Sequence, residues 1–156
     1  DPLDGTREFV KRNGEFTVNI ALIENGIPTV GVVHIPVSGI SYVGQAGRGA
    51  WKVDSQNQPS PIRVSAKVQR PVRVAGSRSH AGDSLKRFLD RLGEHQIVSM
   101  GSSLKLCLVA EGAADVYPRL GPTSEWDTAA AQAVVEAAGG MVTDTQLEPL
   151  RYNTKD

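Results

Sequence analysis

Apolar and polar residues alternate along most of the first seventy positions. The alternating runs are rich in β-branched residues, and they occupy residues 17–23, 29–35, 40–43, 50–53 and 62–64. Asn25-Gly26 and Ser38-Gly39 separate the first three runs, and such pairs are typical of hairpin turns. We therefore predict an antiparallel meander, preceded by a short helix at 5–12 that ends at Asn13-Gly14.

The periodicity changes after Pro71, where apolar residues recur at helical spacing. The apolar face of a helix predicted at 83–92 consists of Leu85, Phe88, Leu89 and Leu92. Further helices at 101–111 and 126–138 are expected to alternate with strands at 72–75, 97–100, 115–117 and from 141. An antiparallel half followed by an alternating half indicates an α/β (α+β) fold in two parts, residues 1–70 and 71–156.

Composition and charge exclude several classes of protein. The 156 residues carry 17 basic and 17 acidic side chains, so nothing suggests a nucleic-acid binder or a polybasic membrane anchor. No apolar run approaches the roughly 18 residues that cross a membrane, and no leader segment is visible. The single cysteine, Cys107, excludes an internal disulfide and is expected in the core. We predict a cytoplasmic protein, with peripheral association with the inner membrane left open.

The chain opens with two carboxylates three residues apart, in Asp1-Pro2-Leu3-Asp4-Gly5-Thr6. Hard divalent cations prefer oxygen ligands, and Asp1, Asp4 and the carbonyl of Leu3 would supply them. The amides of Gly5 and Thr6, at the start of a helix, would then face a phosphate. The structural alternative is an Asp-Pro turn in which Asp4 caps the helix.

A second acidic motif opens the last helix, where Trp126-Asp127-Thr128 follows Ser124. Ser124 and Asp127 fit a capping box, and an acid in the first turn offsets the helix dipole. Alongside the first motif, Asp127 becomes a candidate third metal ligand. Trp126 is expected to serve in packing.

Together the two motifs resemble those of the inositol monophosphatase superfamily. Asp-Pro-Leu-Asp-Gly-Thr at 1–6, with Trp-Asp-x-Ala-Ala at 126–130 and Ala-Gly-Gly at 138–140, is a highly specific combination. The similarity spans nearly the whole chain. It implies the layered α-β-α-β-α sandwich of that family. It also implies a phosphatase that binds two or three Mg²⁺ ions and activates a water molecule without a covalent intermediate.

The resemblance also assigns roles to individual residues. The implied metal ligands are Asp1, Asp4, Asp127 and the backbone carbonyl of Leu3. Gly5 and Thr6 would hold the phosphate, and the Thr6 hydroxyl would position the attacking water, which makes Asp4 and Thr6 the catalytic candidates. Lithium inhibition is expected, because lithium would displace one Mg²⁺.

Further segments are similar to the 3'(2'),5'-bisphosphate nucleotidase branch of this superfamily, at residues 6–19, 77–80 and 101–119. Ser102, Lys105 and Arg119 would converge on a second phosphate, and His80 would contact the base or a phosphate. The implied substrate is a small molecule of sulfur metabolism, adenosine 3',5'-bisphosphate or its sulfated form, and not a nucleic acid. The oligomeric state stays open.

Several alternatives remain at this point. Lys105 would otherwise be solvated on a helix face, and Arg119 would pair with an acid such as Asp115 or Glu125. A competing function is an inositol or sugar phosphatase on the same fold, in which Lys105 and Arg119 are bystanders. A competitor from another class is a non-catalytic module that binds metal or phosphate.

The ends of the chain bear on all of these functions. The chain starts at Asp1 without an initiator methionine and stops at Asp156 without a closing element. In the family that this sequence resembles, an upstream segment supplies a glutamate ligand and an acid that activates the water. We therefore expect a fragment that lacks the N-terminal helices and has little activity by itself.

Overall fold

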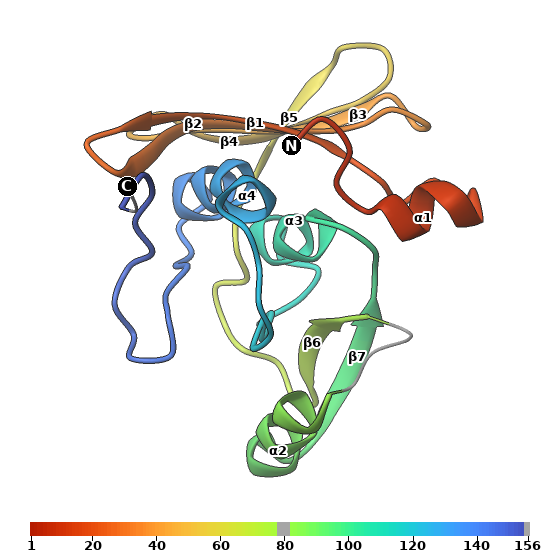
Figure 1. Cartoon of the computed structure of the whole chain (residues 1–156), viewed down its shortest axis with the longest axis vertical. Helices are drawn as coiled ribbons and strands as arrows, with labels where there is room; N and C mark the ends of the chain where they lie inside the picture. The colour runs from red at the N-terminus through yellow and green to blue at the C-terminus, as the bar shows by residue number, and fades with distance from the viewer. Residues whose placement is uncertain (78–81, 155–156) are drawn as a thin grey trace.

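The computed structural model describes residues 1–77 and 82–154. Figure 1 shows the chain in layers: an antiparallel sheet on one side, helices packed beneath it, and a small parallel sheet with a further helix beyond them. This arrangement confirms the mixed α/β class predicted from the sequence.

The larger sheet is built from the alternating runs of the first half. Its five antiparallel strands lie in chain order, as β1 (Val18–Glu24), β2 (Ile27–Ile35), β3 (Ile40–Gln45), β4 (Gly49–Val53) and β5 (Pro59–Ile62). Asn25, Gly26 and Gly39 adopt positive φ in the hairpin turns that the sequence indicated. The predicted meander is confirmed.

The last strand of the meander differs from the prediction. The sequence predicts it at 62–64, whereas β5 ends at Ile62 and Pro59 pairs with Val53. Val64 has already left the sheet, because its amide donates to the carbonyl of Ala138 at 3.1 Å. The prolines of β5 are accommodated because this strand lies at the edge of the sheet.

Two helices cover one face of this sheet. α4 (Glu125–Ala137) lies across β1, β2 and β3, and α3 (Leu104–Ala110) packs beside it. The core between the sheet and the helices includes Val33, Tyr42, Cys107, Ala130 and Val134. Cys107 is 1 % exposed, which confirms its expected place in the core.

The smaller sheet pairs β6 (Val72–Gly76) with β7 (His95–Ser99) in parallel, and α2 (Asp83–Leu92) lies between them in the chain. The predicted bounds of α2 are confirmed, but none of its residues is fully buried. Two predicted strands are wrong. The segment at 115–117 contributes only a bridge between Val116 and Val74, and the segment from 141 only a bridge between Thr143 and Pro149.

Asp115 ties this smaller sheet to the chain that follows α3. Its carboxylate accepts both the amide of Arg73 at 2.8 Å and the guanidinium of the same residue at 2.7 and 3.1 Å. Hydrogen bonds from Arg73 lower the pKa of Asp115. The segment leading to Tyr117 and Arg119 is thereby anchored to β6.

The second half of the chain does not stand apart from the first, since α3 and α4 pack on the larger sheet. The division between 1–70 and 71–156 stays a prediction. Trp126 is 63 % exposed, so the packing role predicted for it is wrong. Within the described parts of the chain, every helix is too short or too polar to cross a membrane.

Candidate active site

The first residues of the chain pair with the segment that enters β1. Asp1 and Asn19 exchange backbone hydrogen bonds of 2.8 Å, and Asp4 and Thr17 exchange bonds of 2.9 and 3.0 Å. The Leu3 amide donates to Asp1 Oδ1 at 2.8 Å. This pairing fixes the backbone that carries both aspartates.

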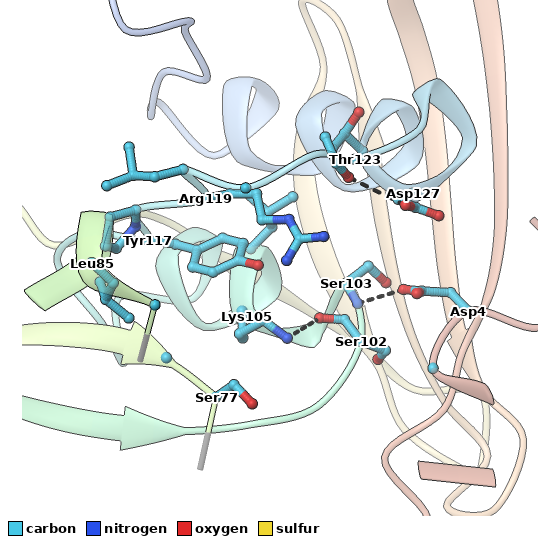
Figure 2. A pocket seen from close by; sticks show the side chains of 18 of the residues that line it. Asp4, Ser77, Leu85, Ser102, Ser103, Lys105, Tyr117, Arg119, Thr123 and Asp127 are labelled. Carbon is cyan, nitrogen blue, oxygen red and sulfur yellow. Dashed lines mark hydrogen bonds between the residues drawn. The ribbon is translucent and has the colours of Figure 1, made fainter. Parts of the chain in front are cut away.

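Gly5 and Thr6 begin the helix α1 (Thr6–Lys11). Gly5 has a φ of 88°, in the left-handed region where a side chain would be strained. Gly5 is itself the N-cap residue, so the alternative in which Asp4 caps this helix is wrong. The Asp4 carboxylate instead reaches across to the loop that precedes α3 (Figure 2).

Three buried polar residues hold the Asp4 carboxylate. Its Oδ2 accepts the Ser103 amide at 2.6 Å, and the side chains of Thr17 and Asn19 donate to it at 3.4 Å. The Ser103 hydroxyl lies 2.9 Å from Thr17 Oγ1 and from Asn19 Oδ1. All three residues lie in segments that the sequence analysis singles out, but it does not connect them with Asp4. The available signal is Thr17-Val18-Asn19, which puts polar side chains at the inward positions of a strand.

Asp127 stands at the start of α4. Its Oδ2 accepts the Ser124 amide at 3.1 Å and the Thr123 hydroxyl at 3.2 Å, which confirms the capping interpretation. The same residue also meets the first motif, because Asp1, Asp4 and Asp127 each offer a carboxylate oxygen within 4.8 Å of the others. The cap therefore fixes where this carboxylate lies relative to the other two.

The donor set suits a hard divalent cation. Carboxylates this close repel one another, so a cation that neutralises them is favoured. Half-buried carboxylate oxygens from Asp1, Asp4 and Asp127 are the ligand type that Mg²⁺ prefers. The chemistry of these residues thus fits the metal that the sequence predicts.

A cleft of about 750 Å³ runs from this acidic cluster toward the smaller sheet. Figure 2 shows Asp4 and Asp127 on one side of it, facing Lys105, Tyr117 and Arg119. The cleft is therefore acidic at one end and carries cations beside it. Such a charge distribution suits an anion bound through metal ions at one point and through cationic side chains at another.

Lys105 is more buried than a surface lysine. It is 9 % exposed, and its Nζ donates to the carbonyls of Ser102 at 2.8 Å and Met100 at 3.3 Å. Burial lowers the pKa of Lys105, while the nearby Asp4 carboxylate opposes that shift. The alternative of a solvated lysine on a helix face is therefore wrong.

Ser102 lies between Lys105 and the acidic cluster. Its backbone is left-handed, with a φ of 44°, which is uncommon for a residue other than glycine. Its Oγ is buried and has no hydrogen-bond partner among the described residues. A buried hydroxyl that lacks a protein partner and lines a cleft is suited to donate a hydrogen bond to a ligand.

Arg119 lines the cleft from an exposed segment, and its Nη2 donates to the Pro122 carbonyl at 2.8 Å. The alternatives that pair it with Asp115 or Glu125 are wrong. Asp115 pairs with Arg73, and Glu125 accepts the Asn153 amide at 3.1 Å.

Tyr117 is a further lining residue that sequence reasoning does not assign to the site. Its ring centroid is 5.5 Å from Lys105 Nζ, and burial raises its pKa. Gly5 and the exposed Thr6 line the cleft together with Ser77. His80, predicted to contact the substrate, lies outside the described residues.

The comparisons with known proteins agree with this geometry. Residues 1–156 match the Inositol monophosphatase family. The chain is 54 % identical over 156 residues to a protein of Escherichia coli K12 named 3'(2'),5'-bisphosphate nucleotidase CysQ. That alignment covers all of this chain and 62 % of the relative. A protein of the same name from Haemophilus influenzae is 35 % identical, with 58 % of it covered.

Solved structures show the same architecture. CysQ from Bacteroides thetaiotaomicron, a bacterial member of the inositol monophosphatase family, superposes with a TM-score of 0.89 at 43 % identity, over the whole chain and 64 % of that protein. An inositol monophosphatase from Anabaena gives 0.78 at 32 % identity, over 99 % of this chain and 62 % of its own. The predicted layered sandwich is thereby confirmed. The chain spans about three-fifths of the curated relatives that it matches over its whole length.

Proposed function

This chain belongs to the inositol monophosphatase family, and on that basis we propose that it forms much of the catalytic unit of a magnesium-dependent bisphosphate nucleotidase. In the proposed reaction, water hydrolyses the 3'-phosphate ester of adenosine 3',5'-bisphosphate to give AMP and inorganic phosphate. The sulfated form of the substrate would give adenosine 5'-phosphosulfate and inorganic phosphate. The observation that carries this proposal is a cleft in which Asp4 and Asp127, clustered with Asp1, face the buried Lys105 and the exposed Arg119. The names of the relatives at 54 % identity support the substrate class.

We assign the metal site to Asp1, Asp4, Asp127 and the Leu3 carbonyl. When bound there, two or three Mg²⁺ ions would lower the pKa of a water molecule and neutralise charge on the phosphate. Asp4 is suited to its role because hydrogen bonds from the buried residues Thr17, Asn19 and Ser103 fix its carboxylate before any ion binds.

Gly5 and Thr6 are proposed to bind the phosphate that is cleaved. Both line the cleft next to Asp4, and the left-handed Gly5 turns the chain into α1 at this point. The Thr6 hydroxyl would hold the attacking water in line with the leaving oxygen. Asp4 would accept a hydrogen bond from the same water, so these two residues orient the nucleophile.

The second phosphate is proposed to lie near Ser102, Lys105 and Arg119. The buried Lys105 contributes a charge that little solvent screens, and Arg119 contributes a planar donor pair from the rim. The Ser102 hydroxyl, which has no partner among the described residues, would donate a hydrogen bond to this phosphate.

The alternative of an inositol phosphatase on the same fold has one observation in its favour, the 32 % identity to the Anabaena inositol monophosphatase. The substitution Lys105→Met separates the two functions, because it keeps the packing and removes the charge. A rise of about tenfold in KM for the bisphosphate supports the nucleotidase. An unchanged KM, with inositol monophosphate turned over equally well, supports the alternative.

The deciding experiment measures phosphate release from adenosine 3',5'-bisphosphate with and without Mg²⁺, using the full gene product beside the 156-residue chain. We expect Mg²⁺-dependent release by the full product and little by the chain alone. If the full product binds the metal but releases no phosphate from adenosine 3',5'-bisphosphate or from inositol monophosphate, the proposal gives way to a non-catalytic binding module.

A further inference from the structure

Two glycines of the larger sheet leave a region without side chains beneath α4. Gly31 in β2 and Gly44 in β3 are cross-strand partners, and both belong to the face that α4 covers. A Cβ atom at Gly31 would lie 2.1 Å from the carbonyl oxygen of Ala130 and 2.8 Å from the Cβ of Ala133. A Cβ at Gly44 would lie 2.5 Å from the Cα of Val134. The backbone of α4 therefore rests directly on the backbone of the sheet.

This close approach sets the depth at which the helix lies. Carbon and oxygen atoms ordinarily stay about 3.5 Å apart, so an added methyl at Gly31 would push α4 away by roughly 1 Å. Repacking of side chains cannot relieve the contact, because the nearest atoms at both glycines belong to the helix backbone.

A shift of α4 would reach the acidic cluster. Asp127 lies three residues before Ala130 and seven before Val134, which is about 4.5 and 10.5 Å along the helix axis. Asp1 and Asp4, by contrast, are paired with the sheet through Asn19 and Thr17. The separation between helix and sheet is thus also the separation between Asp127 and the other two carboxylates.

We propose that Gly31 and Gly44 are positioning residues for the metal site, because they let α4 approach until Asp127 joins Asp1 and Asp4. The inference rests on the metal site assigned under the proposed function. Metal–oxygen distances tolerate only about 0.2 Å, so a displacement of roughly 1 Å at the helix start removes one ligand. A larger residue at either glycine would thus uncouple the site without touching any residue that lines it.

The experiment compares Gly31→Ala and Gly44→Ala with Val134→Ala in the full gene product. Val134 is fully buried in the same interface, so its truncation loosens packing without pushing the helix outward. Binding of Mn²⁺ is followed by the EPR signal of the free ion, in the absence of substrate, and the melting temperature is recorded for every variant.

We expect Gly31→Ala to weaken Mn²⁺ binding at least tenfold and Gly44→Ala about threefold. The smaller effect is expected because Gly44 contacts α4 at Val134, farther from Asp127 than the contact of Gly31 at Ala130. Val134→Ala should lower the melting temperature and leave Mn²⁺ binding within twofold of the unaltered protein. If Gly31→Ala does not fold, the comparison of Gly44→Ala with Val134→Ala decides.

Unchanged Mn²⁺ binding in the folded glycine variants overturns the inference, and so does an equal loss in Val134→Ala. Absence of Mn²⁺ binding in the unaltered protein is a different result, since it overturns the proposed metal site and the inference with it. The two failures are therefore distinguishable.

Discussion

At one end of the cleft, buried neighbours hold the carboxylate of Asp4, whereas at the other end Arg119 extends from an exposed segment. Asp4 is supported by Thr17, which is fully buried, and Asp127 starts a helix that lies on the sheet. Arg119 is exposed, and no residue of α2 beyond it is fully buried. A metal site needs ligands fixed to a fraction of an ångström, while long cations adapt to an anion. The difference in packing matches this difference in chemical demand.

The comparison is tested most directly at Asp127. We expect Asp127→Asn to reduce phosphate release by roughly 10³-fold, because about 4 kcal/mol of charge stabilisation is lost with one ligand. Steady-state release at several Mg²⁺ concentrations measures this loss. Asp90→Asn, an exposed carboxylate on α2, serves as the control and should be neutral. Activity of Asp127→Asn within tenfold of normal would remove this residue from the site.

The Arg73–Asp115 pair anchors the segment that leads to Arg119, and its contribution to stability can be measured separately. Asp115→Asn should lower the free energy of unfolding at pH 7 by about 2 kcal/mol, as expected for a hydrogen-bonded charge. Since Arg73 lowers the pKa of folded Asp115, its contribution is complete above the ordinary carboxyl pKa of about 4 and disappears as the pH falls through the folded value. Urea unfolding at pH 7 and at pH 2.5 should show the difference between variant and parent shrinking in acid. A constant difference would contradict this account.

The buried support of Asp4 is tested by Thr17→Val. Removing the hydroxyl deprives both Asp4 and Ser103 of a partner, so Mn²⁺ affinity should fall about tenfold. Thr29→Val, at a partly buried position of β2 away from the cleft, provides the matched control. Titration calorimetry measures the Mn²⁺ affinity of both variants. Equal affinities would show that metal binding by Asp4 does not depend on the hydrogen bond from Thr17.

The smallest effect is expected at the exposed cation. Arg119→Gln should raise KM for the bisphosphate about fivefold and leave kcat within twofold, because an exposed charge contributes only about 1 kcal/mol. Adding salt should narrow the gap between variant and parent. Arg48→Gln, in the turn between β3 and β4, controls for net charge. A large fall in kcat in Arg119→Gln would mean that catalysis requires Arg119 to be positioned as precisely as the carboxylates.

Sequence reasoning predicts the elements of this fold well where a local pattern exists. The meander and the bounds of α2 follow from period and turn signals. The strand expected at 115–117 is absent because it pairs only at Val116, and that depends on where β6 lies in space. β5 starts before the predicted strand because edge strands tolerate proline.

At the site, the sequence identifies the candidate metal ligands better than the residues that hold them in place. Asp1, Asp4 and Asp127 stand out as motifs, and the structure brings them together. Their roles as ligands stay predictions. The contact of Ser103 with Asp4 is not predicted, because it joins residues 99 positions apart. The burial of Lys105 is equally unpredictable from sequence, because it depends on tertiary contacts such as the one between Lys105 Nζ and the Tyr117 ring.

The position of Cys107 gives this protein a built-in reporter of its own opening. The thiol is the only one in the chain, and burial raises its pKa well above the ordinary range. Thiol-specific reagents attack the thiolate, so labelling requires that α3 separates from the sheet and α4. The rate of labelling would therefore record how often the core opens, and a ligand that binds only the folded state would slow that rate.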